Sequence, residues 1–145
     1  MNIETALHRL VAYYEELTPA HLSQLSSYYH AQAYFKDPFH EVVGIAAIAH
    51  IFQHMFQLDP DAKFTFSHCF VAPDKPLHAM LIWQMSITMA GRHLSIAGSS
   101  HLVFDNEGMV ISHRDYWDTG EELYAKLPWI GGLMRALLRK GSAFR

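Results

Sequence analysis

Cysteine is nearly absent from this chain, because Cys69 is the only one among its 145 residues. An internal disulfide needs a pair of cysteines and a cysteine-based zinc site needs several, so the sequence excludes both. Charged residues are also scarce, at 17% of the chain, against about 25% in a typical domain. The net charge is −3, and this weak negative balance disfavours nucleic acid as a partner.

Long hydrophobic runs are missing as well. The longest uninterrupted apolar stretch, Val42 to Ala49, is far shorter than the roughly 20 residues that span a bilayer. The first residues, MNIETALHRL, do not have the basic-then-apolar order of a signal peptide. Half of the residues are nevertheless apolar, which is enough to build a core and excludes a disordered chain. We therefore expect a cytoplasmic protein with a single domain formed by residues 1–145.

Charges are unevenly distributed near the end of the sequence, where no acidic residue follows Glu122. Residues 129–145 are predicted to form a basic amphipathic segment whose apolar side carries Leu133, Met134, Leu137 and Leu138. Such a segment either lies on an anionic membrane surface or docks on its own domain. We expect docking on the domain or on a dimer mate, because a short segment with few charges anchors weakly. A membrane is therefore not an expected partner.

Apolar residues at helical spacing predict three helices in the first part of the chain. The first extends from Ile3 to Leu17. The second begins at Thr18-Pro19, an N-cap followed by proline at the first helical position. It ends before Asp37-Pro38, because proline disfavours helix in the residue that precedes it. The third extends from about Ile45 to Leu58.

The hydrophobic period then changes to alternation, which predicts four long strands over residues 63–71, 77–89, 92–104 and 109–117. Gly98 interrupts the third strand and is expected to mark a β-bulge. A capping box at Thr119-Gly120-Glu121-Glu122 predicts a short helix that is broken by Pro128. Three helices followed by four antiparallel strands predict an α+β fold.

Two local motifs accompany this order of elements. Phe35-Lys36-Asp37-Pro38 is followed by Gly44 at the start of a helix, and Phe104-Asp105-Asn106-Glu107-Gly108-Met109-Val110 forms a hairpin between long strands. With these motifs, from about Ile3 to Trp117, the chain resembles the nuclear transport factor 2-like superfamily, which includes ketosteroid isomerase and the SnoaL-like polyketide cyclases. The resemblance implies a cone-shaped, curved antiparallel sheet of about four long strands. This sheet would pack on three N-terminal helices, with short C-terminal helices and an apolar pocket in the mouth of the cone.

The resemblance also implies roles for individual residues. Asp37 matches the position of the general base, and Phe35 and Phe39 would supply an apolar setting that raises the pKa of its carboxyl group. The alternative is an ordinary Asp-Pro turn with a solvated carboxylate. Tyr14 is the candidate hydrogen-bond donor from the first helix. Spacing within the family points to Tyr13 instead, whereas the apolar stripe of the helix favours Tyr14. The alternative role for Tyr14 is that of a buried core residue whose hydroxyl has a hydrogen-bond partner.

Ser100 aligns with the aspartic acid that completes the oxyanion hole of ketosteroid isomerase. A serine hydroxyl is a weaker donor, so we do not expect true steroid isomerisation. Trp83 and Trp117 are expected to line the pocket together with Ser100, Phe35 and Phe39.

The segment from His113 to Asp118 carries the second candidate for acid–base chemistry. Strand alternation places Ile111, His113, Asp115 and Trp117 on one face, and the hairpin alignment implies that this face lines the pocket. A histidine beside a carboxylate has a fixed ring orientation and suits proton transfer. The alternative is a polar pair that stabilises the sheet or a dimer interface.

Metal and cofactor motifs are not recognised in the sequence. His50 and His54 have the spacing of metal ligands, but no glutamate completes a His-Glu-x-x-His site, and both point away from the apolar side of their helix. We expect neither a metal nor a cofactor.

Two functions follow from these candidates. One is a cofactor-independent isomerase, cyclase or dehydratase that acts on a small hydrophobic cyclic molecule, with Asp37, His113, Asp115 and Tyr14 as its catalytic residues. The other is a non-catalytic ligand-binding or dimerisation module. A homodimer is expected in either case, because one layer of helices cannot cover both apolar faces of the strands.

Overall fold

Four long strands that follow one another along the chain pair as antiparallel neighbours and form most of one sheet. They are β3 (Lys63–Val71), β4 (His78–Met89), β5 (Arg92–Phe104) and β6 (Val110–Tyr116). Each lies where the alternation of apolar residues predicted it. The structure is a computed structural model in which residues 2–128 and 130–143 are described.

The region from Tyr29 to Lys36 differs from the sequence prediction, which extends the second helix to Asp37-Pro38. A 3-10 helix, η1 (Pro19–Ser27), is followed by two strands, β1 (Tyr29–Lys36) and β2 (Glu41–Val43). β1 pairs with β2 in antiparallel and with β6 in parallel orientation, which gives a six-stranded sheet in the order β2-β1-β6-β5-β4-β3. The sheet is therefore mixed. Pairing with β6 outweighs the helical spacing of the preceding residues.

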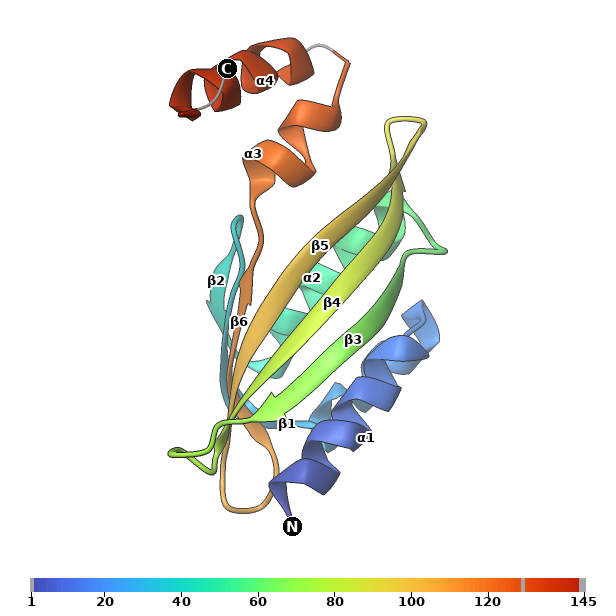
Figure 1. The fold of residues 1–145 in the computed structure, drawn as a ribbon. Helices are drawn as coiled ribbons and strands as arrows, with labels where there is room; N and C mark the ends of the chain where they lie inside the picture. The colour runs from blue at the N-terminus through green and yellow to red at the C-terminus, as the bar shows by residue number, and fades with distance from the viewer. Residues whose placement is uncertain (1, 129, 144–145) are drawn as a thin grey trace.

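Two α-helices lie against the concave face of the curved sheet, and α1 (Ile3–Glu15) runs beside β3 (Figure 1). The Asn2 side chain caps α1 by accepting a hydrogen bond from the Glu4 backbone N–H at 2.8 Å. α2 (Ile45–Leu58) has the predicted bounds and begins after Gly44, whose φ of 102° is a conformation that favours glycine. The core lies between these helices and the sheet.

A β-bulge in β3 changes which of its side chains face the core. The register with β4 shifts between Phe66 and His68, so the expected alternation is reversed beyond this point. Strict alternation would place Phe70 on the same face as Phe64 and Phe66, with Cys69 on the other. Instead, Phe70 is exposed and Cys69 packs against the core.

A second bulge lies where β5 meets β6, between Val103 and Phe104. Because of this shift, Val110 is buried and Ile111 is exposed. The prediction that Ile111 shares the inner face with His113 is therefore wrong.

Gly98 does not mark a bulge, because β4 and β5 pair in continuous register from end to end. Gly98 lies opposite Trp83, and a Cβ at this position would lie under 3.0 Å from three atoms of the indole ring. The glycine thus makes room for the tryptophan, which is a packing requirement.

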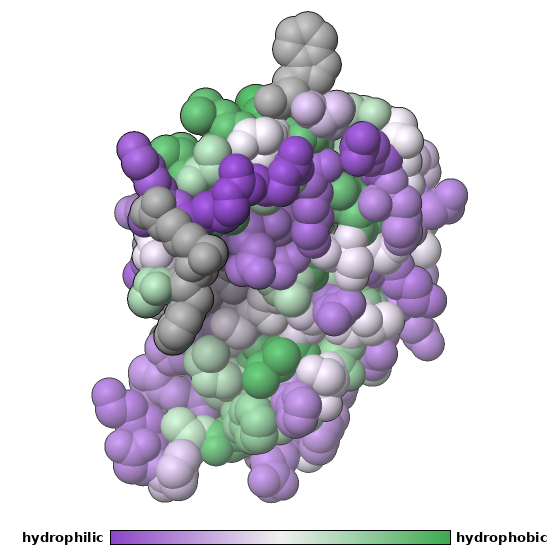
Figure 2. Space-filling view, turned by 45° about the horizontal axis from the view of Figure 1, so that its top comes forward, coloured by the Kyte–Doolittle hydropathy of each residue, from purple (hydrophilic) through white to green (hydrophobic). Residues whose placement is uncertain are grey.

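The C-terminal elements lie beyond one end of the sheet (Figure 1): α3 (Thr119–Glu122), the 3-10 helix η2 (Tyr124–Lys126) and α4 (Ile130–Gly141). Asp118, and not Thr119, caps α3 by accepting hydrogen bonds from two backbone N–H groups. α4 packs on η2 and α3, and side chains of both polarities are visible along it (Figure 2). Trp129 and Arg145, the ends of the predicted basic segment, lie outside the described residues.

No helix among residues 2–128 and 130–143 is long and apolar enough to cross a membrane.

Candidate active site

A continuous chain of hydrogen-bonded side chains crosses the core, and we call it the polar chain. Its members are Tyr14, Tyr29, His113, Asp115, Ser100 and Trp83. The Tyr14 hydroxyl bonds to the Tyr29 hydroxyl, and the Tyr29 hydroxyl lies 2.7 Å from His113 Nδ1. His113 Nε2 lies 2.7 Å from Asp115 Oδ1. Ser100 Oγ donates to the same oxygen at 2.5 Å, and Trp83 Nε1 donates to Ser100 Oγ at 2.8 Å.

The sheet brings these residues together from positions far apart in the sequence. Ser100 on β5 is paired with Asp115 on β6, and His113 on β6 is paired with Phe35 on β1. Tyr29 begins β1, and Tyr14 reaches it from α1. Helix and strands thus supply one side chain after another to a single row of contacts.

The chemistry of the donors gives the polar chain a direction. An indole N–H only donates, so Ser100 Oγ accepts from Trp83 and directs its own hydrogen to Asp115. When Asp115 is ionised, His113 Nε2–H donates to it and Nδ1 accepts from Tyr29. Tyr29 in turn accepts from Tyr14. The donors therefore converge on Oδ1 of Asp115 from both ends.

The polar chain lies in apolar surroundings, with Ser100 only 2% and His113 only 4% exposed. Burial, followed by the neighbouring Tyr29, raises the pKa of Tyr14 well above its usual value. Burial also raises the pKa of Tyr29, to which the Asp115 carboxylate contributes. Both tyrosines consequently remain protonated and act as neutral hydroxyl groups.

Two cavities meet at Asp115. The larger has a volume of about 360 Å³, within the range of small-molecule sites. The smaller, of about 20 Å³, has room for about one water molecule. Tyr14, Ser100 and His113 line the smaller cavity, and Asp115 borders both.

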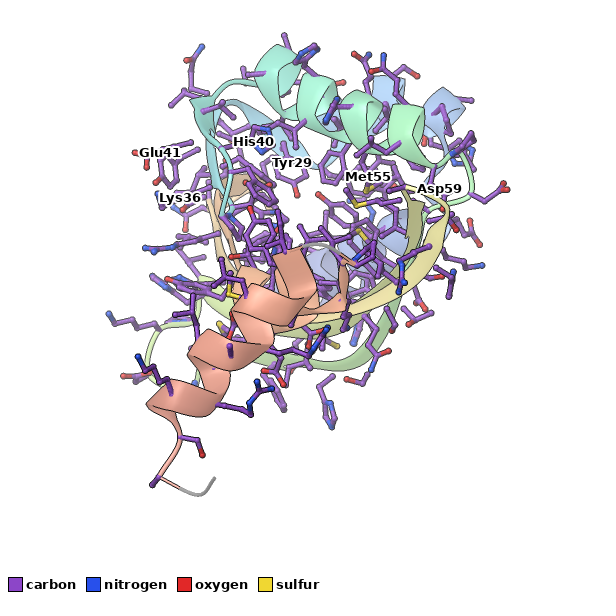
Figure 3. The ribbon with its side chains drawn as sticks, turned by 90° about the horizontal axis from the view of Figure 1, so that it is seen from above. Tyr29, Lys36, His40, Glu41, Met55 and Asp59 are labelled. Carbon is purple, nitrogen blue, oxygen red and sulfur yellow. The ribbon has the colours of Figure 1, made fainter. Side chains whose placement is uncertain are left out.

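Aromatic, aliphatic and methionine side chains form most of the wall of the larger cavity. Its polar residues are Asp37, His40, His54 and Asp115. In the view from above, Met55 and Tyr29 lie in the region between α2 and the sheet (Figure 3). A small hydrophobic molecule therefore fits this cavity better than a charged one.

Asp37 also lines the larger cavity, but its Oδ1 is engaged in a local turn. It accepts hydrogen bonds from the backbone N–H groups of Phe39 and His40, at 2.8 Å and 2.7 Å, and His40 Nδ1 lies 3.0 Å away. This is the turn geometry given above as the alternative role, although the carboxylate is only 13% exposed and is not fully solvated. No described contact joins Asp37 to the polar chain.

The remaining predicted pocket residues differ in their depth. Phe35 is buried with its ring 4.8 Å from that of His113, and Trp83 is buried in both cavity walls. Phe39 is 53% exposed and makes an edge-to-face contact with Trp117. All four line the larger cavity.

The two tyrosines of the first helix have separate partners. Tyr13 donates to the backbone oxygen of His21 at 2.8 Å and stacks on Tyr28. Burial, followed by Tyr28, raises the pKa of Tyr13 to about 12. Tyr14 lines the smaller cavity, so the apolar stripe identified the inward-facing tyrosine and the family spacing did not.

The sequence did not indicate two contributors, Tyr29 and His40. Tyr29 was assigned to a helix, although the buried positions Tyr29, Ala33 and Phe35 follow the even spacing of a strand. For His40, the only signal in the sequence is its three-residue spacing from Asp37. His54 is exposed, as the sequence predicts, and it also borders the larger cavity.

Within the part of the chain that the structure describes, no group of three or more His, Cys, Asp or Glu side chains is placed to hold a metal ion.

The model of the SnoaL-like domain matches residues 10–113 of the chain. A nuclear transport factor 2-like protein of unknown function from Burkholderia pseudomallei superimposes with a TM-score of 0.70 at 12% identity, covering 83% of this chain and 94% of that one. A Catenulispora acidiphila protein with a ketosteroid isomerase-like fold, in complex with trimethylamine, gives 0.67 at 18% identity over 87% and 93%.

An LEH-like epoxide hydrolase of M. tuberculosis gives a TM-score of 0.65 at 13% identity and covers 94% of this chain and 95% of its own. At these identities the solved structures establish the shared fold. No curated protein sequence matches the chain significantly.

Proposed function

The chain belongs to the family of SnoaL-like domains, and on that premise we propose that it is a cofactor-independent enzyme that transfers protons within a small hydrophobic cyclic molecule. The observation that carries this proposal is the position of Asp115, which accepts hydrogen bonds from both sides of the polar chain and borders the larger cavity. A carboxylate oriented by fixed donors at the wall of an apolar cavity suits general acid–base catalysis.

Asp115 is proposed to take the proton directly from the substrate. Ser100 and His113 both donate to its Oδ1, which leaves Oδ2 for a substrate in the larger cavity. A proton taken from one carbon and returned to another completes an isomerisation without any cofactor. His113, Ser100 and Tyr29 position the carboxylate, and His40 and His54 are the groups from which a substrate oxygen accepts a hydrogen bond.

Tyr14 has a different role in this proposal from the one implied by the family resemblance. Its hydrogen is directed to Tyr29 when Asp115 is ionised, so its oxygen offers an acceptor to the smaller cavity. Asp37 is proposed to hold His40 at the wall of the larger cavity, through contacts of 3.0 Å and 3.1 Å to His40 Nδ1.

Removal or addition of water is a second candidate reaction, and the smaller cavity favours it. A water molecule there would lie between Tyr14 and Asp115 and next to the larger cavity. Asp115 would then remove a proton from that water as its oxygen bonds to one carbon of a conjugated C=C bond, and would return the proton to the neighbouring carbon. The reverse reaction is a dehydration.

We also propose a homodimer formed through the outer face of the sheet. Phe70, Met80 and Ile82 are exposed on this face by 51%, 36% and 41%, and the helices cover the opposite face. A second copy is the expected cover for such an apolar surface.

A panel of cyclic compounds tests the proposed reaction. β,γ-Unsaturated cyclic ketones report isomerisation and β-hydroxy cyclic ketones report loss of water, because both products are conjugated enones with ultraviolet absorbance. Conversion of one of these compounds by the wild type, and its loss in Asp115→Asn, would support the proposed enzymatic function. Tight binding of these compounds without any conversion would instead identify a ligand-binding module.

A further inference from the structure

Helix α4 leaves its apolar side uncovered. Ile130, Leu133, Leu137 and Leu138 are exposed by 47%, 64%, 53% and 42%, and they recur at the spacing of one helical face. Of the two expected docking surfaces, the chain's own domain is therefore not the one that covers the leucines, and docking on a dimer mate stays a prediction. Four large aliphatic side chains in water on one helix indicate a contact surface.

The contact of α4 with its own domain uses another side of the helix. Gly131 is buried, and a Cβ there would lie 2.8 Å from the backbone oxygen of Ala125. The Arg135 guanidinium donates to the same oxygen at 2.5 Å. Met134 lies near Gly120 of α3. These contacts fix the helix so that the leucines point away from the domain.

Cations accompany the exposed leucines. Arg139 and Lys140 lie in the last turn of α4, and no acidic residue follows Glu122 in the sequence. In Figure 2 the helix runs between two grey stretches, with strongly hydrophilic side chains along it and hydrophobic ones at its upper edge. A helix with an apolar side, cations elsewhere on its surface and no acidic residue has the pattern of one that lies in a membrane interface.

We propose that α4 docks the protein on an anionic lipid surface, with its leucine side inserted among the lipids and its cations near the phosphate groups. A second copy is the less suitable occupant, because a symmetric contact through α4 would bring cations against cations. The attraction to anionic lipid, in contrast, adds to the burial of the leucines.

This position of α4 bears on access to the larger cavity. Leu123 lines that cavity and lies between α3 and η2, on which α4 packs. A lipid surface at α4 would therefore lie near one wall of the cavity. Such a placement suits a ligand that partitions into lipid, whether or not the protein is an enzyme.

Vesicle flotation of the full-length protein tests the proposal. Vesicles of equal parts phosphatidylcholine and phosphatidylglycerol should carry the protein to the top of the gradient, whereas phosphatidylcholine alone or high salt should not. Leu133→Ser should lower binding about ten-fold, and Arg139→Gln about five-fold. Leu137→Ser serves as a second apolar variant, and thermal unfolding shows that each variant is folded.

Two matched substitutions serve as controls. Val43→Ser changes an aliphatic residue that is 58% exposed on β2, and Lys63→Gln removes an exposed cation on β3; neither should alter binding. No flotation with anionic vesicles, or flotation unaffected by Leu133→Ser, would overturn the proposal. So would a lower molecular mass of Leu133→Ser in sedimentation equilibrium, because a second copy would then cover the leucines.

Discussion

Tyr29 links the two residues that the sequence identified on separate elements, Tyr14 and His113. Its hydroxyl bonds to the Tyr14 hydroxyl and lies 2.7 Å from His113 Nδ1. Tyr29 does not line either of the two cavities, so it acts through His113 and is a positioning residue. Its ring also lies parallel to the His113 ring at 6.0 Å.

Replacing Tyr29 by Phe should therefore impair both the fold and the reaction. The variant leaves a buried nitrogen of His113 without its donor, which costs about 1–3 kcal/mol of unfolding free energy. We expect the turnover rate to fall about ten-fold, with a smaller change in KM, because His113 no longer holds Asp115 in one orientation. Steady-state kinetics and urea unfolding measure the two effects. Tyr28→Phe is the matched control, and an equal effect of both variants would contradict the role of Tyr29.

His101 makes stability depend on pH. It lies on the outer face of the sheet, with its Nε2 2.9 Å from His78 Nδ1 and with Arg114 paired beside it. Burial, followed by the charges of His78 and Lys75, lowers the pKa of His101. The unfolded chain thus binds this proton more readily than the folded protein does.

Between the ordinary histidine pKa of about 6.5 and the lowered value, the unfolded state holds more protons. The contribution of His101 to the free energy of unfolding is therefore complete above about pH 6.5 and is lost as the pH falls toward the lowered pKa. Thermal unfolding across this range should show a smaller slope in His101→Gln than in the wild type. His50→Gln, an exposed histidine on α2, should keep the wild-type slope.

At the scale of elements, the sequence predicted the helix and strands whose signals are local. Gly44 and Asp59-Pro60 bound α2, and alternation located β3 to β6. β1 was not predicted, because its partner β6 lies far along the chain and the helical spacing of Tyr28 and Tyr29 competes with strand pairing.

The candidate site shows the same division between local and distant signals. The alternation of side chains along a strand predicted that His113 and Asp115 share one face. This is confirmed, since His113 Nε2 lies 2.7 Å from Asp115 Oδ1. The bulges in β3 and β6 place Phe70 and Ile111 on the opposite face of the sheet from the one that alternation predicts. Alternation within one strand does not reveal a bulge, because a bulge depends on both paired strands. Tyr29 could not be placed in the site once β1 had been assigned to a helix.

Gly98 couples the pairing of β4 and β5 to the position of Trp83. Gly98→Ala would place a Cβ against the indole ring, and overpacking of this kind costs about 1–3 kcal/mol. We expect a lower unfolding midpoint and an altered tryptophan fluorescence spectrum, because the contact of Trp83 with Ser100 is disturbed. Gly132→Ala on α4, where a Cβ meets no atom within 4 Å, should be neutral or stabilising. A wild-type midpoint for Gly98→Ala would contradict this packing account.

At the scale of the whole molecule, one face of the sheet is covered by helices and the other carries exposed apolar residues. If the outer face pairs two copies, sedimentation equilibrium at micromolar concentration should give about twice the chain mass of 16.6 kDa. Ile82→Lys should shift the mass to that of the monomer, because it places a charge in an apolar contact. A monomeric wild type would contradict the proposed dimer.

Asp115 is proposed to move protons for a molecule held in the larger cavity. Deuterium exchange from D₂O into cyclic ketones, followed by NMR, measures this step directly because it requires only removal and return of a proton. The wild type should exchange hydrogens next to the carbonyl group, and Asp115→Asn should exchange them at least about 100-fold more slowly. Asp37→Asn should retain most of the wild-type rate. Equal rates for the wild type and Asp115→Asn, or a loss confined to Asp37→Asn, would contradict the claim.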